Sequence, residues 1–98
     1  MEAMGDNLGA LEMHNKILVI REKGLGKEHP HTANSYNNIG VLMEAMDDSG
    51  GALEMHNNAL AIRKKVLGKK HSDTVNSSKA VAAIMTSMAD MADMADMD

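Results

Sequence analysis

The chain has 98 residues, which is enough for one small domain and leaves no room for a second independent core. Its apolar residues include 11 Met but only one aromatic side chain, Tyr36, a composition that argues against a β-sandwich or β-barrel. The absence of Cys excludes disulfide scaffolds, Cys-based zinc sites and cysteine nucleophiles, and a formal net charge of −4 gives no general attraction to nucleic acid.

No apolar run approaches the ~20 residues that a membrane span requires, and residues 1–7 (MEAMGDN) lack the basic and apolar regions of a secretory signal. We therefore expect a helix-rich protein of the cytoplasm, with neither membrane nor nucleic acid among its partners.

A self-match is the most informative pattern in the chain. Residues 10–29 (ALEMHNKILVIREKGLGKEH) align with residues 52–71 (ALEMHNNALAIRKKVLGKKH) at an offset of 42, with 14 of 20 residues identical. The same offset pairs residues 1–43 with 43–85 and gives 24 identities. The sequence therefore contains an internal repeat, and a period of this size is typical of repeat architectures built from small structural units.

Each period contains two helical segments, which we expect at about residues 32–46 and 51–67. Between them, residues 47–51 (DDSGG) supply turn formers and a possible N-cap. After the second helix, Gly68 stands where a left-handed C-cap is needed, as Gly26 does in the earlier copy. The repeating unit is thus predicted to be a helical hairpin.

Pro30 prevents the earlier helix from continuing, and Asp73 is a plausible N-cap for the helix that begins at the same place in the second copy. The chain ends in a low-complexity segment, residues 88–98, in which Met-Ala-Asp repeats. A period of three does not match the 3.6 residues of a helical turn, so the Met side chains cannot form one stripe. Ala and Met favour helix, which would let the preceding helix continue into this segment, but Asp near a helix C-terminus opposes the helix dipole. We expect a frayed acidic tail, with a helix that binds in a partner's groove as the alternative.

The spacing of large and small residues is that of a tetratricopeptide repeat. In the first helix the matching positions are Tyr36, Ile39, Gly40 and Met43, and in the second they are Ala52, His56 and Ala59. The small residues Gly40 and Ala52 would let the two helices approach closely. The strings SYNNIG (35–40) and AIRKKVLGKKH (61–71) closely resemble the 42-residue tetratricopeptide repeats of kinesin light chains and nephrocystin-like proteins.

This resemblance implies an all-α fold in which helical hairpins form an α-α superhelix over residues 1–87, with a full repeat at 31–71 between two half repeats. Arrays of this kind need about three repeats to bury a continuous core. We therefore expect a fragment of a longer array. The competing interpretation is a short protein that self-associates through its end helices.

The resemblance also implies a scaffold that binds a protein or peptide in a concave groove. One side of the first helix faces away from the positions that the hairpin must bury, and it would line this groove. Asn is a poor helix former, but its amide can both donate to and accept from the backbone of an extended peptide. In the resembled family, the Asn at the position of Asn38 commonly contacts bound peptide. A solvated face without a ligand is the alternative. The predicted peptide-binding residues are Asn34, Asn37, Asn38, Val41 and Ala45.

No pattern in the chain predicts an enzyme, a cofactor or a metal site. His29 and His31 flank Pro30, but no full set of metal ligands accompanies them. His14 and His56 occupy positions where the repeat has a large ring, so we expect them to pack. The basic residues at 63–65 and 69–70 lie at a helix end, where the helix dipole favours positive charge, and aromatic residues that would stack on bases are absent between them.

Overall fold

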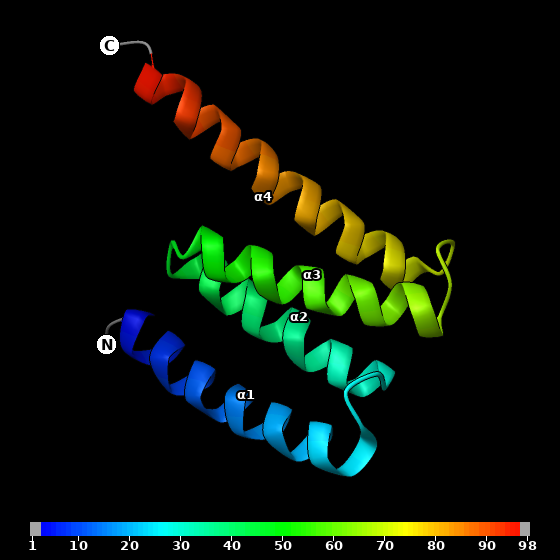
Figure 1. Ribbon diagram of the computed structural model, residues 1–98. Helices are drawn as coiled ribbons and strands as arrows, with labels where there is room; N and C mark the ends of the chain where they lie inside the picture. Colours follow the sequence, from blue (N-terminus) through cyan, green and yellow to red (C-terminus); the bar gives the residue numbers. More distant parts are fainter. Residues whose placement is uncertain (1–2, 97–98) are drawn as a thin grey trace.

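The computed structural model describes residues 3–96, and side chains over residues 6–90. The described chain forms four α-helices joined by short turns: α1 (Ala3–Leu25), α2 (Pro30–Ala45), α3 (Ser49–Val66) and α4 (Ser72–Asp96). The most extensive packing is between α2 and α3, and it is flanked by α1 on α2 and by α4 on α3 (Figure 1). The predicted all-α fold of helical hairpins is confirmed.

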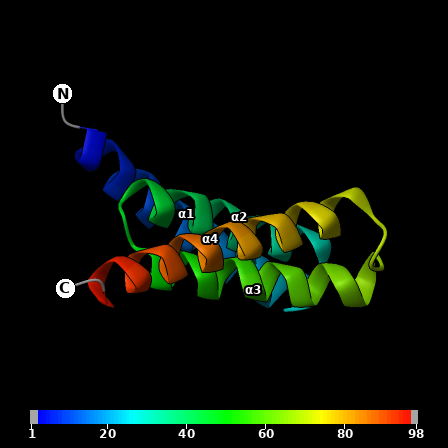
Figure 2. The same cartoon turned by 90° about the horizontal axis from the view of Figure 1, so that it is seen from above.

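The four helices form a slab with extents of 50 × 38 × 18 Å. Seen from above, α4 starts level with α2 and ends level with α3 (Figure 2). Within the described chain, no helix is both long and apolar enough to cross a membrane.

Glycines in the left-handed conformation terminate α1 and α3, as the sequence predicts. Gly26 has φ of +97° and Gly68 has φ of +91°. Their amides donate to the carbonyl oxygens of Arg21 at 3.2 Å and of Arg63 at 3.1 Å. Both ends therefore satisfy carbonyl groups that a terminating helix leaves without partners.

Histidine side chains cap the start of α2 and of α4. The Nδ1 atom of His29 accepts a hydrogen bond from the backbone N–H of His31 at 3.0 Å, and His71 accepts from the N–H of Asp73 at 3.1 Å. The prediction that Asp73 caps α4 is wrong, because the helix already begins at Ser72 and the capping position falls on His71. By contrast, Asp48 caps α3 through a 2.9 Å bond from the N–H of Gly51, as the turn-forming sequence indicates.

The Met-Ala-Asp segment differs from the expected frayed tail. The helix α4 continues without a break to Asp96, and its C-terminal part diverges from α3 (Figure 1). Ala and Met are good helix formers, and an existing helix extends without a new nucleation step. Local propensity therefore outweighs the unfavourable placement of Asp near the helix end.

Small residues form much of the buried core. Ala33 of α2 and Ala59 and Ile62 of α3 form one cluster, against which the half-buried Tyr36 packs. The other buried apolar side chains are Ile39, Ala52 and Ile84. A core with so many Ala residues requires the helix backbones to lie close together.

Gly40 and His56 mark the tightest approach of α2 to α3. A Cβ atom at position 40 would lie 2.7 Å from Nε2 and 2.8 Å from Cδ2 of the His56 ring. The ring is only 1% exposed, and its Nε2 lies 3.0 Å from Oε2 of Glu44. The predicted roles of Gly40 as a spacer and of His56 as a packing ring therefore follow from one contact.

We predict that Gly40→Ala lowers the free energy of unfolding by about 1–3 kcal/mol, although Ala is the better helix former. The added methyl group would overlap a ring that Glu44 and the surrounding core hold in place. Urea denaturation would measure the effect. The matched control is Gly50→Ala, where a Cβ would meet nothing within 4 Å, and this variant should be at least as stable as the wild type. Equal stability of both variants would contradict the assigned contact.

Candidate interaction surfaces

Arg63 joins three of the four helices. From α3, its Nη1 donates to Oγ of Ser77 at 2.8 Å and to the carbonyl oxygen of Asp73 at 3.2 Å, both in α4. Its Nη2 donates to Oδ1 of Asn34 in α2 at 2.9 Å. The side chain is 6% exposed, so these bonds provide the hydrogen bonding that a buried guanidinium requires.

Arg21 repeats this arrangement one period earlier. Its Nη1 donates to Oγ of Ser35 and to the carbonyl oxygen of His31, each at 3.0 Å. The helix dipole was the expected reason for the basic residues at the helix ends, and these hydrogen bonds of the Arg side chains were not predicted. The available signal was that the Arg and Ser positions are both identical across the 42-residue offset.

The predicted peptide-binding residues differ in their surroundings. Asn38, Val41 and Ala45 are exposed on α2, and Asn37 is half-buried. Asn34 is also exposed, but Arg63 holds its side-chain oxygen. The Nδ2 group of Asn34 has no hydrogen-bond partner among the described residues, and the contact with Arg63 fixes its direction.

The equivalent side of α4 has a different chemistry. Asn34 corresponds to Asn76, which is exposed, whereas Asn37 and Asn38 correspond to Lys79 and Ala80. The row of amides on α2 is therefore not continued along α4.

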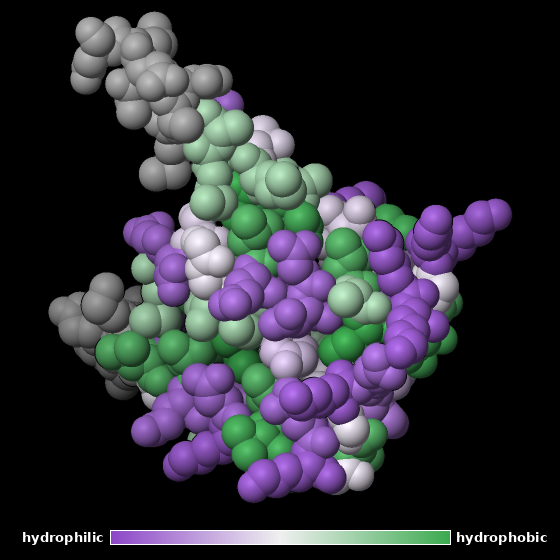
Figure 3. Space-filling model, in the orientation of Figure 1, coloured by the Kyte–Doolittle hydropathy of each residue, from purple (hydrophilic) through white to green (hydrophobic). Residues whose placement is uncertain are grey.

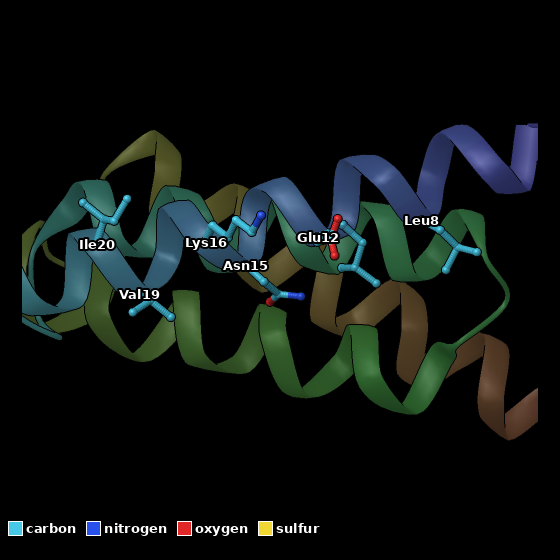
Figure 4. Close-up of a pocket in the computed structure, with 7 residues that line it drawn as sticks. Leu8, Glu12, Asn15, Lys16, Val19 and Ile20 are labelled. Atoms are coloured by element: carbon cyan, nitrogen blue, oxygen red, sulfur yellow. The ribbon is translucent and has the colours of Figure 1, made fainter.

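The outer side of α1 carries an open apolar hollow of about 690 Å³. Leu8 is 52% exposed there and Val19 is 47% exposed. Figure 4 shows that Val19 and Ile20 leave the helix in different directions, and both side chains line the hollow. Hydrophobic side chains also reach the surface where α1 runs in the space-filling view (Figure 3). The hollow can receive an apolar side chain, while Glu12 and Lys16 provide polar groups beside it.

Several other titratable side chains have structural contacts. His29 and His71 are helix caps, and among the described residues no group of three His, Asp or Glu side chains is arranged to hold a metal ion. Within the basic segment at the end of α3, Lys65 pairs with Glu28 at 2.6 Å on the surface. Surface pairs of this kind stabilise a protein by at most about 1 kcal/mol.

Tyr36 forms the second link between α1 and α2. Its hydroxyl donates to Oε2 of Glu22 at 2.7 Å. Burial of the phenol, its hydrogen bond to Glu22 and the negative charge of that carboxylate raise the pKa of Tyr36 to about 12. In the second copy Ser78 and Lys64 occupy these two positions, so this link is not repeated between α3 and α4.

The sequence profile of the tetratricopeptide repeat family matches residues 1–65, about two thirds of the chain. Together with the four packed helices, this match shows that the chain belongs to the tetratricopeptide repeat family. Repeats of this family generally mediate protein–protein interactions, and they typically serve as non-enzymatic scaffolds.

The chain is also similar to the Clustered mitochondria protein of Arabidopsis thaliana, with 46% identity over 37 residues. The aligned segment covers 38% of this chain and 3% of that protein. The chain thus matches only a very small part of this relative.

We predict that Arg63→Lys destabilises the fold more than Arg21→Lys does. A lysine ammonium cannot reproduce the planar fork that reaches Asn34, Ser77 and the Asp73 carbonyl at once. We expect a loss of about 2–3 kcal/mol for the buried Arg63 and about 1 kcal/mol for the half-buried Arg21, measured by urea denaturation. Equal losses would contradict the role of Arg63 as the link among three helices.

We also predict that folding delays the ionisation of Tyr36, which is the only tyrosine and can be followed by tyrosinate absorbance. The unfolded chain releases this proton near pH 10, whereas the folded chain keeps it until about pH 12. The free energy of unfolding that this raised pKa contributes is therefore fully present below about pH 10 and is lost as the pH rises toward about 12.

At about pH 11 the folded protein should contain little tyrosinate, and the protein unfolded in urea should contain mostly tyrosinate. Circular dichroism at the same pH would verify that the first sample is folded. Glu22→Gln should lower the pH at which half of Tyr36 is ionised in the folded protein, because it removes the negative charge beside the phenol. A folded wild type that ionises near pH 10 would contradict the Tyr36–Glu22 contact.

Proposed function

We propose that this chain is an interaction scaffold that binds an extended protein segment along the side of α2 carrying Asn34, Asn38 and Val41. The observation that carries the proposal is a row of exposed Asn and apolar side chains on a helix whose opposite side is fully buried at Ile39. Asn is unfavourable inside a helix, so such a row is better explained by a ligand than by folding.

The contact between Arg63 and Asn34 supports this proposal. A side chain that is already fixed loses less conformational entropy when a ligand binds. The Nδ2 group of Asn34 can donate to a backbone carbonyl of the ligand, and the amide of Asn38 can both donate and accept. Such contacts recognise the backbone of a peptide largely independently of its side chains.

Val41 and Ala45 follow the amides along α2 and offer a short apolar surface. A matching ligand would bind the amides through its backbone and place one small apolar side chain against Val41 and Ala45. The matching positions of α4 lack two of the amides, so we propose that α2 contributes most of the binding energy.

We further propose that the chain is of the 42-residue type found in kinesin light chains and nephrocystin-like proteins, and that it acts in the cytoplasm. The period of 42 and the strings SYNNIG and AIRKKVLGKKH support this assignment. The partner, on this proposal, is a protein or peptide.

We predict that Asn38→Ala weakens a peptide ligand by ~1–2 kcal/mol, because a hydrogen bond at a desolvated contact is lost. A peptide selected by display against the wild type would serve as the ligand, with affinity measured by calorimetry. The fold should be unaffected or slightly more stable, since Ala is the better helix former.

The matched control for this experiment is Asn58→Ala, which makes the same change at an exposed position of α3. This variant should bind the peptide as the wild type does. If Asn38→Ala retains full affinity while remaining folded, α2 is not the binding surface.

A second candidate function is self-association through the end helices. The observation that favours it is the 68% exposure of Ile20 on α1, an unusually large value for an apolar side chain at a core position of the repeat.

A further inference from the structure

The internal repeat makes α1 equivalent to α3, yet the two helices have different neighbours. Ile62 of α3 is 8% exposed because it packs with Ala33 of α2. Ile20 is the equivalent residue of α1 and is 68% exposed. Among residues 3–96, α2 is the only helix that packs extensively on α1, and it covers a different side. The side of α1 that corresponds to the α2-binding side of α3 is therefore open.

The helix α4 has the complementary property. It is equivalent to α2, and the side with which α2 packs on α3 is exposed in α4. Val75 is 36% exposed, whereas its equivalent, Ala33, is fully buried. Met85 is 56% exposed, and the intervening Ser78 and Ala82 are exposed as well. One chain thus contains the α2–α3 interface once as a formed contact and once more as two separated halves.

We infer that a second copy of this chain docks its α4 on the open side of α1, in the arrangement in which α2 packs on α3. The inference rests on the second candidate function and specifies its interface. A second copy is the partner that fits, because both halves of an interface already formed within the chain are present on its surface.

A polar contact fixes the register of this docking. In the formed interface, Nη2 of Arg63 donates to Asn34 while its Nη1 binds the following helix. Arg21 has the same Nη1 contacts, but its Nη2 has no hydrogen-bond partner among the described side chains. The residue equivalent to Asn34 is Asn76, which is exposed on α4. Docking in the α2–α3 arrangement brings Asn76 of one copy to the free Nη2 of Arg21 in the other.

The apolar residues at the two halves also compensate for one another in volume. Ser78 replaces Tyr36 and removes a ring from the interface. Val75 replaces Ala33, and Ile17 replaces Ala59, so both substitutions add carbon atoms where the ring is lost. Changes that conserve the total volume are the ones that packed interfaces tolerate best.

One position makes the docked interface looser than the formed one. Ala82 stands where Gly40 is, and a Cβ at Gly40 would overlap the ring of His56. The ring of His14, which is equivalent to His56, must therefore turn aside when α4 docks. His14 is only half-buried, so it has room to turn. We expect reversible association with an affinity well below that of the hairpin contact.

The interface is head-to-tail, since it joins two different surfaces of the chain, and such a contact gives a ring only where the rotation between copies closes. Docking in the α2–α3 arrangement continues the row of packed helices from one copy to the next, so we expect an open chain of copies. Sedimentation velocity of the 98-residue chain should therefore show dimers and longer species whose proportion rises with concentration. A closed dimer with no larger species would overturn the inference.

Complementation of two variants tests the geometry. Ile20→Lys places a charge on the α1 half and Ala82→Lys places one on the α4 half, both at exposed positions where folding should be retained. Each variant alone should be monomeric, because its remaining good surface has no good partner. An equimolar mixture should form a one-to-one heterodimer and nothing larger. Circular dichroism would verify that both variants fold.

Two milder substitutions test the register. Asn76→Ala should weaken association about tenfold through loss of a hydrogen bond to a charged group, and Asn57→Ala on α3 should leave it unchanged. Ala82→Gly should strengthen association, because it removes the methyl group that would overlap the His14 ring of the other copy. Its control is Ala83→Gly, which lowers helix propensity equally at the neighbouring exposed position without making room for that ring.

The possible results distinguish self-association in general from docking through this particular α1–α4 interface. A wild type that stays monomeric up to millimolar concentration would overturn both self-association and this interface. Association that persists in the two Lys variants, or a mixture that fails to pair, would overturn the interface and leave self-association through other surfaces. Retained affinity in Asn76→Ala would overturn the register in the same way.

Discussion

The buried guanidinium of Arg63 sets the arrangement on which the rest of the structure depends. A charged group that is 6% exposed requires hydrogen bonds, and these come from Asn34 in α2 and from Ser77 and the Asp73 carbonyl in α4. One side chain thereby ties the inner hairpin to the helix that follows it. The same contact orients an amide on the surface proposed for peptide binding, so packing and recognition share a residue.

Comparison of the two copies shows how a repeat can diverge while keeping its hairpin geometry. The Arg–Ser contact, the His cap and the left-handed Gly are present in both copies. The Tyr36–Glu22 bond and the Gly40–His56 approach occur once. Thr32 donates to the carbonyl oxygen of Gly26 at 2.8 Å, whereas the hydroxyl of its equivalent, Thr74, has no partner among the described residues. The Arg–Ser contact and the helix ends are thus retained between the copies, whereas the bonds of Tyr36 and Thr32 are not.

The two proposed activities use different sides of the molecule. Peptide binding requires the exposed amides of α2, and docking of a second copy requires α1 and α4. Both can occur together, and head-to-tail association would then align the α2 surfaces of successive copies. A weak individual affinity for a repetitive ligand would be strengthened by such an array.

The sequence by itself determined the period, the helical hairpin, the two glycine C-caps and the close approach at Gly40, because these follow from local propensity and from residues repeated at an offset of 42. It also indicated which side of α2 faces away from the core. Only the tertiary structure decided that His71 and not Asp73 caps α4, and that Arg63 reaches Asn34 across 29 positions of sequence. The exposure of Ile20 against the burial of Ile62 was likewise beyond the sequence, which gives both residues the same position in the repeat. Their difference comes from the neighbouring helix that covers Ile62 and has no counterpart beside Ile20 among the described residues.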